Sequence, residues 1–470
     1  MSNNRMMIRA GVPLAAGLIV LLLPVPEGLS PTAWRYFALF VAAMTGIATE
    51  PLPPALLGLV AVSIAAAARL VYPTPAQSLS WALSGFANPT IWLIFAAYMF
   101  AAGYSKTGLG RRIALLLIRA MGRSTLGLGY AVAFSDGLIA PFMPSNTARS
   151  GGTIYPAIRH IPELYDSYPN DPSARKIGSY ILYTALATSC ITSSLFLTGL
   201  APNVLAKGMA LKIINQEISW TSWFIGYAPV GVLLFLTTPW LLFKIYPPTI
   251  RQSPDAPRWA AEQLRAMGPS SRREKTLLAL SLWIFGTKYL DPTLSAVIVV
   301  CLMALTGVVS WDDIIGNAAA WNVLIWFGTL VTLANGLGES KFLAWVSGTV
   351  SPHFAGHSPY VTAALLATTY YLLHYLFASI TAHVSALYPV FLAVAITLPG
   401  LSPLGWALLL GYPAGVFGIL NPYATGPAPI YYGSGYIPGK DFWIYGFILG
   451  MIFLLAYLAI GLPWLLWLQP

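Results

Sequence analysis

Two short polar phrases of nearly the same sequence lie in the two halves of this chain. They are Ser145-Asn146-Thr147-Ala148-Arg149 and Ser379-Ile380-Thr381-Ala382-His383. Ser and Thr are favourable N-cap residues, so each phrase can open a helix whose first amide N–H groups lack backbone partners. Those N–H groups, the positive end of the helix dipole and the hydroxyls together form an anion site. Two phrases that face each other could each hold one carboxylate of a dicarboxylate.

A second repeated phrase follows each of the first two. It reads Thr198-Gly199-Leu200-Ala201-Pro202 in the first half and Thr425-Gly426-Pro427-Ala428-Pro429 in the second. Because Gly permits unusual backbone angles and Pro removes a backbone donor, each copy predicts a break in a helix. The two breaks would add polar backbone to the same cavity. The candidate substrate-binding residues of the four phrases are Ser145, Asn146, Thr147, Ser379, Thr381, Thr198, Gly199, Pro202, Thr425, Gly426 and Pro427.

The composition places these phrases in a membrane protein. Of 470 residues, 57% are hydrophobic and only 9% are charged, whereas a soluble domain carries about 25% charged residues. We therefore predict an all-α polytopic membrane protein with about 11 transmembrane helices of ~20 residues and two re-entrant hairpins. The apolar runs are Val12–Leu23, Trp34–Ala48, Leu52–Ala68, Ile91–Ala102, Tyr227–Phe243, Ala296–Val309 and Trp443–Trp467.

The net charge of +10 does not indicate nucleic-acid binding, because the basic residues gather in short segments between apolar runs. They precede the first run, follow the fourth and fill the centre of the chain. By the positive-inside rule these segments face the cytoplasm, so we expect a cytoplasmic N-terminus and, with an odd number of crossings, an external C-terminus. The first run lacks a small-x-small cleavage site and is expected to be retained as a span.

A linker divides the chain into nearly equal halves. Residues 247–275 are rich in Pro, Arg and Ser, and a short helix is expected within them around Trp259–Met267. The halves match at an offset of about 234 residues, and the count of spans gives equivalent elements opposite directions, which predicts an inverted repeat. The expected units are an N-terminal transmembrane helix at 1–33, a first repeat at 34–246, a cytoplasmic linker at 247–275 and a second repeat at 276–470.

The chain around each Ser-x-Thr phrase differs from an ordinary span. Gly127–Phe142 is apolar, but Asp136-Gly137 and Pro141 interrupt it, and Pro144 follows. Re-entrant hairpins are therefore predicted at residues 127–161 and 360–396, with the phrases at their tips. Non-helical backbone at membrane depth is tolerated only inside protein or beside water, so the tips are expected to line a solvated cavity. The simple alternative is that these hydroxyls bond the preceding turn or pack helices.

The four phrases resemble those of the divalent anion/sodium symporter family, and the resemblance covers nearly the whole chain. It implies a di- or tricarboxylate substrate, a homodimer whose protomers each have a scaffold and a transport domain, and elevator-type alternating access. The family pattern also implies that Asn203 supports the site. Stretches that resemble its bacterial citrate/succinate antiporter branch, and the chloroplast 2-oxoglutarate/malate translocators, are Gly108–Leu115, Pro144–Arg149, Asn170–Arg175 and Tyr423–Pro427.

The chain departs from the sodium-coupled members of that family in two ways. Those members have Ser-Asn-Thr in both halves, and the Asn helps to ligate sodium, whereas Ile380 offers no side-chain oxygen to a hard cation. Arg149 and His383 stand at equivalent positions, where sodium-coupled relatives carry small residues. We hypothesise that these two protein cations replace bound sodium and neutralise the substrate. The alternatives are an arginine that reaches the cytoplasmic surface and a histidine that makes a structural hydrogen bond.

Three other groups have open roles. Asp136 is a candidate functional residue, because ionisable groups at membrane depth are rare, and it can equally pair with a nearby hydroxyl. His374 can line the second hairpin or pack helices, and Lys288 can pair with Asp291 without a functional role. The two cysteines lie far apart in apolar stretches and predict neither a disulfide nor a metal site.

The function predicted from these features is sodium-independent exchange of di- or tricarboxylates across a bacterial inner membrane, without a cofactor or metal. The substrate class includes citrate, succinate, malate, tartrate and 2-oxoglutarate. The alternative is a sodium-coupled symporter with one cation site around Ser145, Asn146 and Gly199. An intramembrane enzyme is disfavoured, because the sequence has no His-Glu-x-x-His, no Gly-x-Ser-x-Gly and no carboxylates paired at catalytic spacing. Saturable, trans-stimulated flux would exclude a channel.

Overall fold

Helices dominate the part of the chain that the structure describes. The computed structural model covers residues 3–286, 291–354 and 356–468, and in these residues the only bridge between extended segments joins Ser124 and Gln252. An all-α architecture is therefore confirmed. The predicted pairing of Lys288 with Asp291 lies partly outside the described residues.

The helical elements of the first half lead from the N-terminus to the linker, and η marks 3-10 and π segments. They are α1 (Asn3–Leu22), α2 (Pro31–Thr49), α3 (Pro54–Ala67), α4 (Pro75–Leu83), α5 (Pro89–Thr107), α6 (Leu109–Met121), α7 (Thr125–Ile139), η1 (Ala140–Phe142), η2 (Thr147–Ile154), α8 (Tyr155–Ile158), η3 (Pro162–Tyr165), η4 (Pro172–Lys176), α9 (Gly178–Leu195), η5 (Leu197–Gly199), α10 (Ala201–Ile214) and α11 (Trp220–Ile245).

The linker and the second half continue this order to the C-terminus. Their elements are α12 (Asp255–Met267), α13 (Arg272–Gly286), α14 (Pro292–Leu305), α15 (Trp311–Ile315), α16 (Ala318–Glu339), α17 (Phe342–Val350), η6 (Ser351–Phe354), α18 (Pro359–Leu372), η7 (Leu373–Leu376), α19 (Ile380–Ala395), α20 (Pro403–Gly411), α21 (Pro413–Val416), η8 (Phe417–Ile419), α22 (Ala428–Gly433), α23 (Gly439–Ala456), η9 (Tyr457–Gly461) and α24 (Leu462–Leu468).

Many of these helices begin at a polar cap followed by proline. Ser30, Asn88 and Ser402 accept hydrogen bonds from backbone N–H groups in the first turn of α2, α5 and α20, and a proline follows each cap. Proline suits this position, because its fixed φ matches the helix and its missing N–H would have no partner there. Sequence signals of this kind set the starts of the apolar segments.

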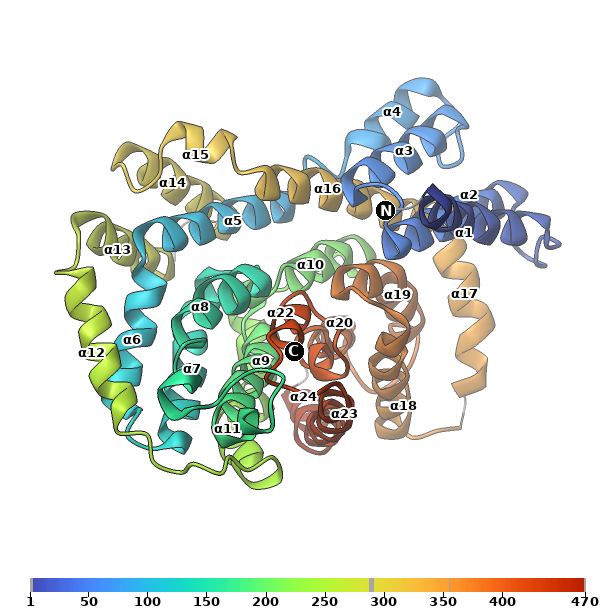
Figure 1. The fold of residues 1–470 in the computed structure, drawn as a ribbon. Helices are drawn as coiled ribbons and strands as arrows, with labels where there is room; N and C mark the ends of the chain where they lie inside the picture. Colours follow the sequence, from blue (N-terminus) through green and yellow to red (C-terminus); the bar gives the residue numbers. More distant parts are fainter. Residues whose placement is uncertain (1–2, 287–290, 355, 469–470) are drawn as a thin grey trace.

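Each apolar run of the sequence lies mostly in helical segments, as predicted. Four stretches of the described chain are long and apolar enough to cross a membrane: Thr125–Phe142, Trp220–Ile245, Ala318–Glu339 and Gly439–Leu468. Shorter apolar helices accompany them, and α5 and α16 run across one side of the molecule, above the upright helices of both halves (Figure 1). The count of about 11 crossings stays a prediction.

The chain turns back at both Ser-x-Thr phrases. In the first half, α7 leads through η1 to a tip at Met143–Asn146, and η2 returns along α7. In the second half, α18 and η7 lead to Phe377–Ser379, and α19 returns along α18. Pro141 and Pro144 help to end the first arm, because proline cannot continue the hydrogen bonding of a helix. Each phrase therefore opens the second arm of a helical hairpin.

The two halves interlock at these hairpins. α10, the helix that follows the first break, packs along α19 of the second hairpin. The reciprocal contact joins α22, which follows the second break, to η2 of the first hairpin: the hydroxyls of Tyr431 and Ser150 are 2.9 Å apart. Each returning arm therefore rests against the helix that follows the break of the other half.

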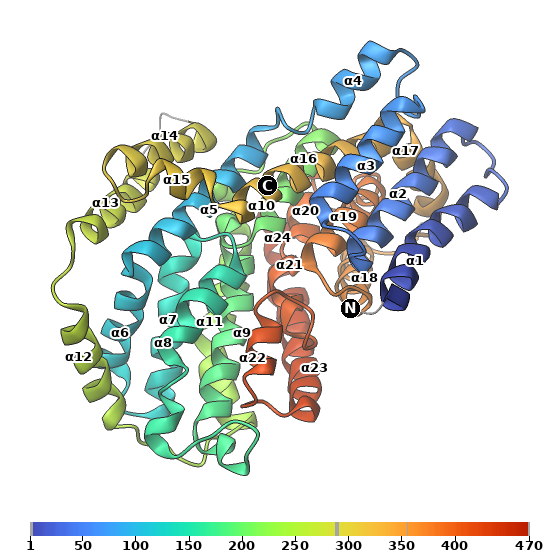
Figure 2. The same cartoon turned by 45° about the horizontal axis from the view of Figure 1, so that its top comes forward.

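A helix covers the predicted position of the linker helix and begins four residues earlier. α12 spans Asp255–Met267 and packs beside α6 at the outer edge of the molecule (Figure 2). Arg112 of α6 donates from Nε to Glu274 Oε1 at 2.7 Å and from Nη1 to the Gly268 carbonyl at 3.0 Å. The basic segment after α5 is therefore joined directly to the central linker.

Candidate anion site at the broken helices

The first tip is joined to the second break. Ser145 Oγ accepts a hydrogen bond from the Ala148 N–H at 3.2 Å, which is the expected capping contact. Asn146 Nδ2 donates to Thr425 Oγ1 at 2.7 Å. A Cβ atom built on Gly426 would lie 1.9 Å from Thr147 Oγ1, so a side chain at this position would have to displace the Thr147 hydroxyl. The first tip and the second break form one polar cluster.

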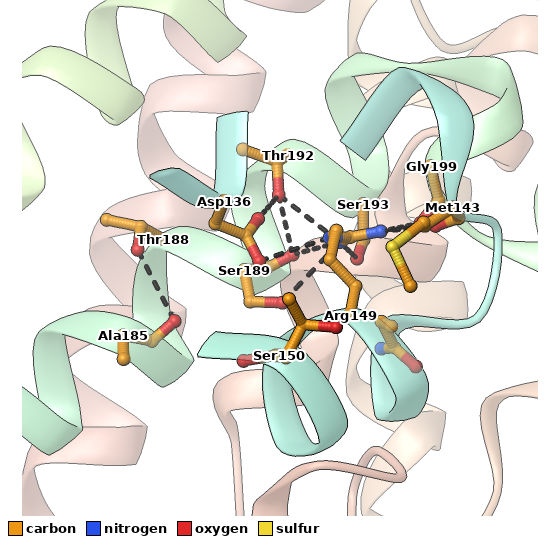
Figure 3. Close-up of polar contacts among 12 residues, drawn as sticks. Asp136, Met143, Arg149, Ser150, Ala185, Thr188, Ser189, Thr192, Ser193 and Gly199 are labelled. Carbon is orange, nitrogen blue, oxygen red and sulfur yellow. Dashed lines mark hydrogen bonds and ion pairs between the residues drawn. The ribbon is translucent and has the colours of Figure 1, made fainter. Parts of the chain in front are cut away.

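Arg149 occupies the interior of the first hairpin (Figure 3). Its side chain has 0% exposure, and that of its ion-pair partner Asp136 has 1%. The guanidinium bonds the first arm, the tip, the first break and α9. These contacts run from Nε to Asp136 Oδ1 (3.1 Å), from Nη1 to the carbonyls of Met143 (2.7 Å) and Gly199 (2.6 Å), and from Nη2 to Ser193 Oγ (2.9 Å), Thr192 Oγ1 (3.3 Å) and Ser189 (3.4 Å to O, 3.5 Å to Oγ).

The carboxylate of Asp136 also has a second partner, because Thr192 Oγ1 donates to its Oδ2. A guanidinium has five N–H donors, and each nitrogen of Arg149 bonds the protein. Arg149 therefore does not reach the surface in this conformation, and Asp136 balances its charge. The hypothesis that Arg149 neutralises substrate charge stays a prediction.

The second tip has the same capping contact. Ser379 is the N-cap of α19, and its Oγ accepts from the Ala382 N–H at 3.4 Å. Thr381 is buried, and its carbonyl accepts from Ser385 Oγ at 2.6 Å. Ile380 is also buried. Among the described residues no hydrogen bond links the two tips, so their joint contact with one substrate stays a prediction.

His383 and His374 form a buried pair in the second hairpin. Their Nδ1 atoms are 3.3 Å apart, and His374 Nε2 is 2.8 Å from the carbonyl oxygen of Ala424, in the second break. Phe417 stacks on His374 at a centroid distance of 3.9 Å, and Tyr370 meets His383 edge to face at 4.5 Å. His383 Nε2 is buried without a hydrogen-bond partner. The structural hydrogen bond considered for His383 is therefore present at Nδ1, and Nε2 is left open.

The first break lies against the first tip. Thr198 Oγ1 donates to the Pro141 carbonyl at 2.6 Å, and the Ala201 N–H donates to the Pro144 carbonyl at 2.7 Å. Asn203 Nδ2 donates to the Ser193 carbonyl at 2.6 Å, and its Oδ1 is buried without a partner. Both predicted breaks are present: η5 and the extended residue that follows it separate α9 from α10, and non-helical backbone precedes α22.

The candidate residues differ in access to solvent. Thr147 and Gly426 are exposed, and Ser145, Thr198 and Ser379 are partly exposed. The buried candidates are Asn146, Arg149, Gly199, Pro202, Asn203, Thr381, His383, Thr425 and Pro427. A cavity of about 520 Å³ opens between α10, α16, α17 and α19, at the end of α19 that lies away from its tip, and its polar lining includes Lys212, Asn335, Glu339 and Lys341. This cavity borders the helices of the site and does not include the tips.

Sequence reasoning missed two sets of partners. The hydroxyls that bond Arg149 come from Ser189, Thr192 and Ser193 of α9, and their spacing of three and four residues places them on one face of a helix. That spacing was a readable signal. Tyr431 bonds Ser150 across the repeats, and no local pattern indicates this contact.

The apolar helices, the broken segments and the buried polar tips define a multi-pass membrane transport protein, not an enzyme. The chain belongs to the sodium:sulfate symporter family. A family model described as "Sodium:sulfate symporter transmembrane region" matches residues 4–469. This confirms the family expected from the four phrases.

Curated relatives cover the same length. The L-tartrate/succinate antiporter of Escherichia coli strain K12 is 47% identical over 470 residues, with 96% of each chain covered. The protein of the same name from Shigella flexneri is also 47% identical over 470 residues. Among solved structures, the Alcanivorax borkumensis YdaH transporter is similar, with a TM-score of 0.56 and 16% identity over 87% of this chain and 96% of that one. This structural likeness supports the fold alone.

Proposed function

We propose that this protein exchanges dicarboxylates of the L-tartrate and succinate class across a bacterial inner membrane, without sodium coupling. The observation that carries the proposal is the full-length similarity, at 47% identity, to antiporters named for these two acids. Citrate, malate and 2-oxoglutarate are further candidates of the same chemical class.

The geometry supports binding of an anion at the tips. Both tips have capped helix starts with serine hydroxyls partly open to solvent, and the first tip contacts the break of the second repeat. Helix N-termini and hydroxyls stabilise carboxylates without a metal. We therefore assign the carboxylates of the substrate to Ser145–Thr147 and Ser379–Thr381, with Thr198–Asn203 and Thr425–Pro427 as supporting backbone.

The absence of sodium coupling is argued from the first tip. The Gly199 carbonyl, a candidate cation ligand, already accepts from Arg149 Nη1 at 2.6 Å. A guanidinium at this carbonyl takes the place of a hard cation, and Ile380 removes an oxygen ligand from the second tip. The alternative is sodium-coupled symport through Ser145, Asn146 and Gly199, which the retained Asn146 favours.

The proposal extends to assembly and motion. We infer an inverted repeat, an elevator-type movement of the hairpins against a scaffold, a homodimer, a cytoplasmic N-terminus and an external C-terminus. The reciprocal packing of α10 on α19 and α22 on η2 supports the repeat, because a pseudo-twofold axis relates such contacts.

Counterflow in proteoliposomes tests the function. Vesicles loaded with unlabelled succinate are diluted into sodium-free buffer with labelled L-tartrate, and we expect transient accumulation of label. Vesicles without internal dicarboxylate are the control, and citrate, malate and 2-oxoglutarate replace tartrate in parallel samples. If the label accumulates only with an inward sodium gradient, and does so without internal dicarboxylate, the protein is a sodium-coupled symporter.

A further inference from the structure

The hydrogen bonds of the histidine pair fix which nitrogen carries each proton. A carbonyl oxygen can only accept, so His374 Nε2, at 2.8 Å from the Ala424 oxygen, carries hydrogen. In a neutral imidazole the other nitrogen is then an acceptor. His383 Nδ1, at 3.3 Å from His374 Nδ1, must therefore donate. His383 Nε2 is left with a lone pair, and this is the atom that is buried without a partner.

We propose that His374 and His383 form a single proton-binding unit, which takes up one proton at His383 Nε2 when the dicarboxylate binds. This inference rests on the proposed exchange function. The proton comes from solvent and forms one N–H bond, and no protein bond breaks. Transfer of the shared Nδ1 proton from His383 to His374 can then place the positive charge on either ring. His374 is a positioning residue, because it fixes the tautomer of His383 through the carbonyl of the second break.

The histidine pair lies where a positive charge would stabilise a substrate carboxylate at the second tip. His383 lies one turn into α19, and its N–H donates to the carbonyl of the tip residue Ser379 at 3.1 Å. Ser379 is partly exposed, and its neighbour Ala378 is exposed. The tip therefore offers a short route from solvent to the His383 ring. His383 also matches Arg149 at the repeat offset. The unit therefore supplies a conditional charge where the first hairpin has a permanent guanidinium, whose charge Asp136 balances.

The surroundings of the pair link proton uptake to anion binding. The ring contacts of His383 come from Tyr370, Phe377, Phe417 and His374. Within the described part of the chain, no hydrogen bond or ring contact of either imidazole involves a carboxylate, a lysine or an arginine. Burial among apolar rings disfavours charge on the empty pair, and a bound dianion offsets that cost. Charged groups on elements packed against α19 are Arg35 of α2, Lys207 and Lys212 of α10, Glu339 of α16 and Lys341 before α17.

Those charged groups lie in surroundings other than the histidine pair. Lys207 pairs with Glu217 at 2.7 Å, and Lys212, Glu339 and Lys341 line the 520 Å³ cavity. Arg35 is exposed. Among the described residues of the second hairpin, these two histidines are the side chains that titrate near neutral pH, and Tyr370 is their neutral neighbour. In one-for-one exchange the proton would cross with each substrate, and no net proton would move.

The test measures the affinity for L-tartrate by counterflow between about pH 5 and 8, where histidine titrates. The carboxyl groups of tartrate stay ionised in this range, because carboxyl groups titrate near about pH 4. We expect the affinity to weaken by up to about tenfold per pH unit as the pH rises, because binding is linked to one proton. His383→Gln should bind weakly at every pH, and His374→Leu should flatten the profile.

Conservative and control variants separate this role from a structural one. Glutamine at position 374 can donate to the Ala424 carbonyl and accept from His383, so His374→Gln should recover the pH dependence lost in His374→Leu. His160→Gln, at an exposed loop position, should match the wild type. A wild-type affinity independent of pH, or a His383→Gln variant with the wild-type profile, would overturn the proton unit. Loss of counterflow by the wild type at every pH would instead refute the exchange function.

Discussion

The two hairpins have the same backbone plan and opposite interiors. In the first, Arg149 is buried with every guanidinium nitrogen bonded and with Asp136 as its counter-ion. In the second, His383 holds the equivalent position, and an aromatic ring, Tyr370, stands where the repeat offset matches Asp136. The first interior is a closed charge network, and the second is an aromatic shell with one open lone pair.

This difference shows how a repeated fold can hold unlike chemistry at matched positions. The guanidinium joins α7, the tip, η5 and α9, and so it fixes the first hairpin to its surroundings. The histidine pair makes one hydrogen bond to the second break. We therefore expect the first hairpin to depend on Arg149 for stability, and the second to depend on His383 for the strength of substrate binding.

The largest effect should follow from breaking the charge network. Arg149→Gln leaves Asp136 buried without its cation, and removal of one partner of a buried pair costs about 3–5 kcal/mol. We expect a large loss of thermal stability in detergent. Arg111→Gln is the control, since Arg111 bonds Gln263 at an exposed site.

The double variant Arg149→Gln with Asp136→Asn should recover part of that stability, because no unpaired charge remains. An Arg149→Gln protein as stable as the wild type would show that the network does not hold the hairpin.

A smaller but clear effect should follow from filling the contact between tip and break. Gly426→Ala places a methyl group where Thr147 Oγ1 lies 1.9 Å away, and overpacking of this kind costs about 1–3 kcal/mol. We expect the counterflow rate to fall by about tenfold, because a cost of about 1.4 kcal/mol on the transport step corresponds to a tenfold slower rate. Gly433→Ala is a matched control, because no atom lies within 4 Å of its added Cβ. Equal counterflow rates for both variants would show that the contact between tip and break is not part of the transport site.

The bond between Asn146 and Thr425 should have a moderate and coupled effect. Asn146→Ala and Thr425→Ala each remove one side of the 2.7 Å hydrogen bond. A double-mutant cycle on substrate affinity should give a coupling of about 0.5–1.5 kcal/mol. Strictly additive losses would mean that the two halves do not act together at this point.

The smallest effect should come from the cap of the second tip. Ser379→Ala removes a long 3.4 Å capping bond and should cost about 0.5–1 kcal/mol of thermal stability. Ser379→Gly should restore most of that stability, since Gly is nearly as good at an N-cap. Substrate affinity should stay reduced in both variants if the hydroxyl binds the anion. Full recovery of affinity with Gly would reduce Ser379 to a structural role.

The sequence predicted the local parts of this architecture. Gly and Pro mark both breaks, Ser145 and Ser379 mark both tips, and the Pro- and Arg-rich centre contains the linker helix. These features depend on the residues themselves and on their near neighbours. Caps and helix breaks can therefore be read directly from the chain.

The partners of the buried groups could not be predicted in the same way. Arg149 bonds Gly199 and the α9 hydroxyls 40 to 50 residues away, so tertiary packing decides its partners. His374 and His383 are nine residues apart on opposite sides of the second tip. Their contact depends on the extended backbone at the tip, for which the local sequence carries no distinct signal.

Trans-stimulated efflux is the direct test of sodium-independent exchange. Proteoliposomes loaded with labelled succinate are placed in sodium-free buffer, with or without external L-tartrate. We expect slow efflux that accelerates strongly when tartrate is added and does not respond to sodium. Efflux that ignores external tartrate, and that accelerates with sodium on the same side as the label, would contradict exchange through a site whose charges belong to the protein.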